Sequence, residues 1–128
     1  MTRNVLIAVL GLGLLVVAGP VFAHHSISAE FDINSPIEFT GTVSQVDWLN
    51  PHIYTHVDVQ GANGNTVTYK VEGSPPNSLY RRGWRSDSLK PGDHVTVEGV
   101  RAKSAESMNV GQATITTDAG QRVFSGSN

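Results

Sequence analysis

The 128-residue chain contains no cysteine, carries little charge and has no excess of basic residues. Without cysteine there is neither a disulfide nor an attachment point for a lipoprotein anchor, so stability has to come from core packing or from a bound partner or metal. The formal net charge is −2, with 9 basic against 11 acidic residues. A chain of this charge has no excess of positive charge that would attract nucleic acid or an anionic membrane.

Recognisable catalytic motifs are lacking as well. The sequence holds no nucleophile elbow, no paired-carboxylate signature, no phosphate loop and no zinc-type ligand spacing. Ser26 follows His25, but two neighbours in sequence do not make a catalytic triad. We therefore assign no catalytic residues and expect a protein that is not an enzyme.

The longest hydrophobic run lies at the start of the chain. Arg3 precedes an apolar stretch at 5–19, Pro20 interrupts it, and the small residues of "VFA" (21–23) form an A-x-A-like cleavage site. This order is typical of a secretory signal peptide, and the stretch is short for the roughly 20 residues of a transmembrane helix. We predict a leader at 1–23, export to the periplasm without membrane attachment after cleavage, and one small domain at 24–128.

Alternating apolar and polar residues divide the predicted domain into short strands. The expected strands are 36–48, 52–60, 66–73, 94–102 and 108–117, followed by a short end strand at 122–124. In the first strand the apolar positions change phase near Ser44 and Gln45. A change of phase inside a strand indicates a β-bulge, which lets a long strand coil around a small barrel.

The segment between the third and fourth strands differs in kind. Asn77 or Ser78 is expected to cap a short helix through "SLYRRGW" (78–84), with Leu79 and Trp84 packing on the sheet. Three strands, one short helix and two more strands are the order of the OB-fold, a five-stranded Greek-key barrel. We therefore predict an all-β, OB-like barrel with one short helix between strands 3 and 4. An open β-sandwich is the alternative.

Several motifs together resemble a family of small exported proteobacterial proteins of unknown function. They are "AHHS" at the predicted cleavage site, W-x-N-P-H at 48–52, "VEGSPPNSLYRRGW" at 71–84 and "SLKPGDHVTVEG" at 88–99. The resemblance spans essentially the whole predicted domain. It implies a periplasmic OB-like barrel and brings no known reaction with it.

The histidines offer the clearest chemistry. If cleavage exposes His24, its α-amine and ring Nδ1 can chelate one metal ion, with His25 beside it. Nitrogen ligands in a tetragonal plane favour Cu(II), and an α-amine pKa near ~8 makes the required proton loss modest. The amino terminus that begins at His24 resembles the histidine brace of lytic polysaccharide monooxygenases and of some copper carriers. The resemblance is limited to this local motif, because those proteins have an immunoglobulin-like core. The alternative is a frayed terminus without a fixed partner.

Two further histidines are candidates for the next metal ligand. His52 and His56 share one face of the predicted second strand, four residues or about 13 Å apart. One of them, rather than both, is therefore expected to reach an ion held by His24. The structural alternative for His52 is a hydrogen bond at the strand start, just after the turn-forming pair Asn50-Pro51. His94, at the head of another strand, is expected to face solvent.

A second candidate surface surrounds the predicted helix. We assign a ligand or partner surface to Tyr54, Glu72, Arg81, Arg82 and Trp84. Arginine binds carboxylates and anions with two parallel hydrogen bonds, and Trp and Arg are frequent anchors at interfaces. The arginines could pair with Glu72, with Asp87 or with a bound anion, and the simpler interpretation is a structural salt bridge that fixes the helix to the barrel.

Three functions follow from these observations. The leading hypothesis is a non-enzymatic periplasmic binding module for a small ligand or a periplasmic protein. The second is a copper-binding protein that uses His24 with His52 or His56, copper being the one cofactor the sequence suggests. The third, oligonucleotide binding, is opposed by the acidic charge, by export and by the scarcity of aromatic residues interleaved with Lys and Arg.

Overall fold

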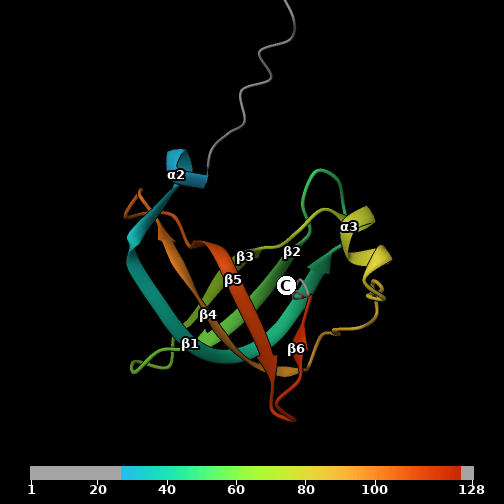
Figure 1. The fold of residues 1–128 in the computed structure, drawn as a ribbon. Helices are drawn as coiled ribbons and strands as arrows, with labels where there is room; N and C mark the ends of the chain where they lie inside the picture. Colours follow the sequence, from blue (N-terminus) through green and yellow to red (C-terminus); the bar gives the residue numbers. More distant parts are fainter. Residues whose placement is uncertain (1–26, 125–128) are drawn as a thin grey trace, which may run out of the picture.

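Five strands close into a ring in the computed structural model, which describes residues 27–124 (Figure 1). The predicted leader at 1–23 lies outside these residues. The elements, in chain order, are α2 (Ile27–Glu30), β1 (Phe31–Asp47), β2 (Tyr54–Gln60), β3 (Thr66–Glu72), α3 (Pro76–Arg81), β4 (His94–Ala102), β5 (Asn109–Thr117) and β6 (Arg122–Val123).

The strand order confirms the predicted OB-like barrel. The strands pair in the order β3-β2-β1-β4-β5-β6, and an additional parallel pairing of β3 with β5 closes the ring. That closure is short, since it consists of Lys70 opposite Asn109 and Val71 opposite Val110. The helix α3 lies between β3 and β4 in sequence, as predicted, and β6 adds a short hairpin at β5. The barrel, rather than the open sandwich, is therefore the architecture.

The long first strand bends where its apolar pattern changes phase. Its pairing with β2 shifts register between Val43 and Gln45, which confirms the predicted bulge. At this point the backbone of Val43 bonds the turn before β4, accepting from Gly92 N–H at 2.8 Å and donating to the Asp93 carbonyl at 2.8 Å. A Cβ on Gly41 would lie 2.5 Å from the Asp58 carbonyl oxygen, so only glycine permits this close crossing of β1 over β2.

The first strand also begins earlier than the apolar alternation predicts. Phe31 pairs with Ala102 of β4, five residues before the expected start at Pro36. The register with β4 shifts between these two positions, which hides the extension from a period-two pattern. Phe31 is buried because its ring packs on Gly111, where a Cβ would come within 2.7 Å of the ring.

The helix starts two residues before the predicted position. Pro75 occupies the N-cap without a side-chain hydrogen bond and Pro76 is the first helical residue, so the expected caps Asn77 and Ser78 were wrong. A proline at the first helical position has no N–H to leave unpaired and its φ suits a helix. Leu79 is fully buried, which confirms its predicted packing on the barrel.

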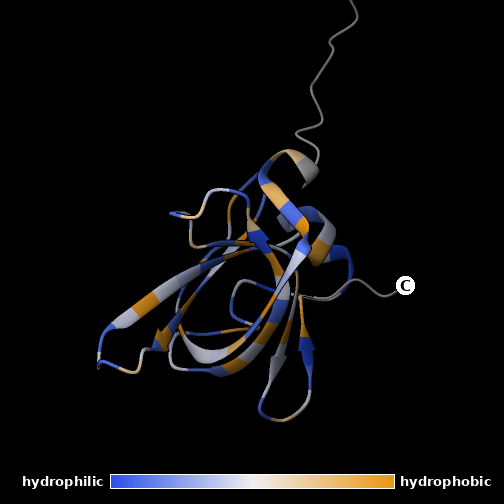
Figure 2. Cartoon of the chain, turned by 90° about the vertical axis from the view of Figure 1, so that its left-hand side faces the viewer, coloured by the Kyte–Doolittle hydropathy of each residue, from blue (hydrophilic) through white to orange (hydrophobic). Residues whose placement is uncertain are grey.

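Most of the buried core residues of the barrel are aliphatic. Hydrophobic and hydrophilic residues alternate along the strands (Figure 2). The core cluster includes Ile37, Val43, Ile53, Val57, Val71, Leu79, Leu89, Val95, Val97, Val110, Ile115, Val123 and Phe124. Thr55, on the inner face of β2, is the one buried polar residue among those that the structure describes. Its hydroxyl has no hydrogen-bond partner. A ligand therefore has to bind on the outer surface or at the barrel mouth.

Candidate functional site

The outer faces of β2 and β3 bring several of the sequence-predicted residues together. Strand alternation points Tyr54 and His56 outward from β2, and the register places Tyr54 opposite Glu72 and His56 opposite Lys70. His52 lies just before β2 and contacts the end of β3. We call His52, Tyr54, Lys70 and Glu72 the His52 cluster. All four side chains are half-buried.

The ring of His52 is fixed by the main chain. Its Nδ1 lies 3.0 Å from the carbonyl oxygen of Gly73 and 3.5 Å from Oε1 of Glu72. A carbonyl can only accept, so Nδ1 carries the hydrogen and donates it. In the neutral ring the other nitrogen, Nε2, then keeps its lone pair, and the side chain is 40% exposed. Histidines that bind metals are oriented in the same way by a carbonyl or carboxylate behind the ring.

Glu72 is a carboxyl group whose charge is disfavoured by its surroundings. Burial raises its pKa above the ordinary value, and the carboxylate of Glu30 raises it further, while His52 and Lys70 oppose the shift. Burial likewise raises the pKa of the Tyr54 phenol, with contributions from the charges of Glu72 and Glu30. A cation or hydrogen-bond donor placed beside Glu72 would relieve this cost.

Lys70 lies over the face of Tyr54 rather than in an ion pair. Its Nζ is 4.0 Å from the centre of the ring. Such a cation–π contact contributes about 0.5–1 kcal/mol at a partly exposed site. It holds both side chains against the sheet.

His56 has a different environment from His52. Its Nε2 lies 2.8 Å from Oδ2 of Asp47, and the ring is 23% exposed. The hydrogen bond from Gln45 and the one from His56 lower the pKa of Asp47. A metal ion bound at Nε2 of His56 would have to break the contact with Asp47, so His52 is the more accessible of the two predicted third ligands.

The first described helix lies near the His52 cluster. Glu30, in α2, receives a hydrogen bond from Asn109 Nδ2 at 2.9 Å, and its charge shifts the pKa of both Glu72 and Tyr54. His24 and His25, the predicted amino-terminal ligands, lie outside the described residues. Within residues 27–124 no group of three or more His, Cys, Asp or Glu side chains is arranged to hold a metal ion.

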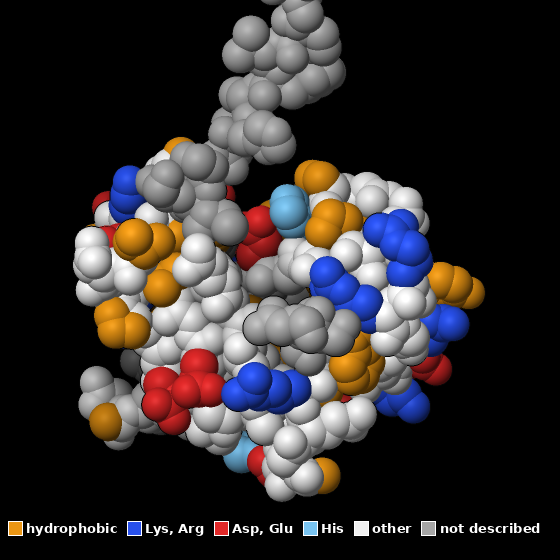
Figure 3. All heavy atoms as spheres, viewed as in Figure 1, with side chains coloured by type: hydrophobic (Ala, Val, Ile, Leu, Met, Phe, Trp, Pro, Cys, Tyr) orange, Lys and Arg blue, Asp and Glu red, His pale blue; other side chains and the backbone are white. Residues whose placement is uncertain are grey.

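The arginines around α3 do not join this cluster. Glu72 pairs with His52, and none of the salt bridges formed within residues 27–124 involves an arginine, so the expected structural salt bridge from an arginine to Glu72 or Asp87 was wrong. Arg81 and Arg82 are exposed. Basic side chains gather on the side of the molecule where α3 lies (Figure 3). Arg85 stacks on Tyr80, 3.8 Å from its ring centre.

Trp84 attaches α3 to the barrel. Its ring meets Phe124 edge-on with a centroid distance of 6.0 Å, and Trp48 packs on the same Phe124 at 5.6 Å. The predicted packing of Trp84 on the sheet is therefore confirmed. Trp84 was also assigned to a partner surface, but its ring is partly buried against the core, so only part of it is available to a partner. His94 is exposed, as expected, and its Nδ1 lies 3.0 Å from Asp118 Oδ1.

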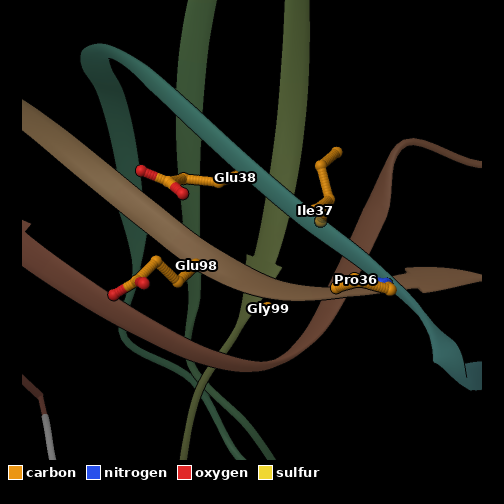
Figure 4. Close-up of a pocket in the computed structure, with 5 residues that line it drawn as sticks. All are labelled: Pro36, Ile37, Glu38, Glu98 and Gly99. Atoms are coloured by element: carbon orange, nitrogen blue, oxygen red, sulfur yellow. The ribbon is translucent and has the colours of Figure 1, made fainter.

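A shallow hollow of about 340 Å³ lies on the outside of β1 and β4, away from the His52 cluster. Glu38 and Glu98 are directly opposite each other across these strands and extend to the same side, whereas Ile37 turns away from them (Figure 4). Like charges facing each other across a strand pair are destabilising. Both carboxylates are exposed to solvent, which weakens this repulsion.

Sequence reasoning missed one member of the His52 cluster, Lys70, and two neighbouring residues, Asp47, which pairs with His56, and Glu30, which shifts the pKa of Glu72. Lys70 could have been found from the hairpin, because the turn at 61–65 fixes which residues of β2 and β3 face each other. The position of Asp47 beside His56 depends on the bulge in β1, and the position of Glu30 depends on the course of the chain before β1. Neither has a local sequence signal.

Comparison with known proteins identifies the family. Residues 11–112 match a family described as a family of unknown function, DUF6152. No curated protein and no solved structure matches the chain. Within residues 27–124 no helix is long and apolar enough to cross a membrane. Because the match covers most of the sequence, including four of the five strands of the ring completely, the chain belongs to this family of unknown function.

Proposed function

We propose that this chain is a non-enzymatic binding module of the periplasm that binds its ligand on the His52 cluster. The observation that carries the proposal is the half-buried Glu72, whose pKa is raised by burial and by Glu30. Its charge is incompletely compensated by His52, 3.5 Å away, and by Lys70, which lies over Tyr54. Perturbed titratable groups gathered on one surface are typical of functional sites.

The chemistry of the cluster favours a cationic ligand. Glu72 gains a partner when a cation binds, and His52 offers a lone pair on Nε2 in its neutral form. The filled barrel interior directs a ligand to the outer surface. The absence of catalytic motifs from the sequence supports binding rather than turnover.

Native mass spectrometry of the protein purified from a periplasmic extract tests this function. We expect a chain that begins at His24 together with a bound species of higher mass. The species should be lost from the Glu72→Gln variant and retained in Glu98→Gln, which removes an exposed carboxylate on the far strand pair. A bound species that survives Glu72→Gln, or a chain recovered without any ligand, would contradict the proposal.

Copper is a second candidate because of the orientation of His52. The hydrogen bond from Nδ1 to the Gly73 carbonyl fixes the ring and its tautomer, as in histidines that ligate metals. His24 precedes Ile27 by three positions, so the chain allows its backbone to lie at most about 11 Å from that residue. The α-amine and Nδ1 of His24 with Nε2 of His52 would supply three nitrogen ligands, a set that suits Cu(II).

Isothermal titration with Cu(II) separates copper binding from other functions. A chain that begins at His24 should bind one Cu(II), and one alanine added before His24 should weaken binding at least tenfold, because it removes the amine chelate. His52→Gln should weaken binding similarly, whereas His56→Gln and the exposed control His94→Gln should not. Binding that is insensitive to the extension and to His52→Gln would exclude this copper site.

A further inference from the structure

The barrel has a small mouth where β3 separates from β5. These strands pair only at Lys70–Asn109 and Val71–Val110, so Tyr69, the preceding residue of β3, has no partner on β5. A cavity of about 230 Å³ lies at this point, bounded on its outer side by the loop that joins β4 to β5. In Figure 1 this loop lies at the same end of the barrel as α2. The cavity does not include any residue of the His52 cluster.

The floor of the cavity is apolar and partly aromatic. Ile37 and Val110 are buried core residues that reach its base, and Tyr69 forms one wall. The Tyr69 ring is held by a stacked contact with Phe39, with a centroid distance of 4.3 Å and an interplanar angle of 21°. A rigid aromatic wall of this kind favours a flat apolar group beside it.

The rim of the cavity carries a positive charge. Arg101 lines it, is exposed, and forms no ion pair with any of the residues that the structure describes. Ser107 and Asn109 add polar groups, although the amide of Asn109 already donates to Glu30. A guanidinium at the mouth of an apolar cavity matches a ligand with an anionic head and an apolar body, because arginine binds carboxylates with two parallel hydrogen bonds.

The size of the cavity limits the ligand. A volume of about 230 Å³ corresponds to roughly eight water molecules at about 30 Å³ each. This is the space for about eight to ten non-hydrogen atoms, which is the size of one aromatic ring with a carboxylate. We propose that this mouth is a second binding site, specific for small aromatic carboxylates, and that Arg101 binds the carboxylate.

Benzoate is the probe, and amide chemical shifts in ¹⁵N-labelled protein report where it binds. We expect saturable shifts at Tyr69 and over 101–110, and none centred on His52 or Glu72. Benzamide, which has the same shape without the charge, should bind at least tenfold more weakly. The location of the shifts distinguishes this site from the His52 cluster. Either proposal can therefore be refuted while the other stands.

Two arginine variants test the role of the charge. Arg101→Gln should weaken benzoate binding about tenfold or more, since hydrogen bonds to a charged group are worth about one to two powers of ten in affinity. Arg101→Lys should retain part of the affinity. The matched control Arg122→Gln, an exposed arginine on β6, should bind as the unmodified protein does.

Three results would overturn the proposal. The first is equal affinity for benzoate and benzamide. The second is unchanged binding in Arg101→Gln, and the third is a set of shifts that never saturates or that lies elsewhere on the barrel. Because Arg101 is exposed and forms no ion pair with residues 27–124, its replacement should leave the dispersion of the amide spectrum intact, so a loss of binding can be distinguished from unfolding.

Discussion

Replacing Thr55 by valine should stabilise the protein. Thr55 is 1% exposed on the inner face of β2, opposite Val46 in β1 and Val71 in β3, and its hydroxyl has no hydrogen-bond partner. A buried polar group without a partner costs about 1–3 kcal/mol. Valine keeps the β-branched shape and replaces the hydroxyl by a methyl group among aliphatic neighbours. We expect the free energy of unfolding to rise by about 1–2 kcal/mol.

Urea denaturation followed by circular dichroism measures this change, and thermal unfolding gives a second estimate. In a domain of about 60–100 residues, 1 kcal/mol corresponds to a shift of about 4–8 °C in Tm. Thr68→Val is the matched control, because that exposed hydroxyl donates to Asp58 at 2.6 Å and its loss should be destabilising. A less stable Thr55→Val variant would show that the hydroxyl is satisfied. The barrel interior would then hold a polar partner, contrary to the reasoning that places ligands outside.

Three further predictions concern charge and packing. Because the pKa of Glu72 is raised, the folded state binds the proton of this carboxyl group more tightly than the unfolded state does. The contribution of Glu72 to the free energy of unfolding therefore falls as pH rises from the unfolded-state pKa to the folded-state pKa. Urea midpoints should therefore show Glu72→Gln more stable than the unmodified protein at pH 7 and equal to it at pH 3. The pKa of Asp47 is lowered, so its contribution is present above the unfolded pKa and is lost as pH falls through the folded pKa. Asp47→Asn should therefore be less stable at pH 7, by an amount that disappears in acid, and a deficit unchanged at low pH would contradict the pairing with His56. Gly111→Ala should cost about 1–3 kcal/mol of stability in the same assay, because its Cβ would press on the buried ring of Phe31, and a neutral effect would refute that contact.

The strands of the barrel were predictable because their signals are local. Alternation places Ile53, Val57 and Val71 inside, and the change of phase in the first strand locates the bulge between Val43 and Gln45. The order of strands and helix then suffices for the topology, because few folds of this size share it.

Features that depend on neighbours distant in sequence were not predictable. The early start at Phe31 requires the space that Gly111 leaves in β5. The helix starts earlier than predicted because Pro76 begins it without a side-chain cap, whereas Asn77 and Ser78, whose side chains suit an N-cap, lie inside it.

The candidate site was predictable in part. His52, Tyr54 and Glu72 were each chosen from the sequence, and the hairpin brings them together. Their partners were not foreseen, because the hydrogen bond from His52 to Gly73 and the effect of Glu30 on Glu72 depend on how three separate segments meet. The arginines near α3 were expected to be partners of Glu72, but none of the ion pairs formed within residues 27–124 involves an arginine.

The location of a bound Cu(II) ion tests the central claim most directly. Cu(II) broadens the amide signals of nearby residues, so the order in which signals disappear from an ¹⁵N spectrum of a chain beginning at His24 maps the ion. The His52 cluster predicts loss first at residues 52–54 and 72–74, with the signals around His94 and Asp118 retained. Loss centred on His94 and Asp118, or loss that leaves residues 52–54 and 72–74 untouched, would contradict the account.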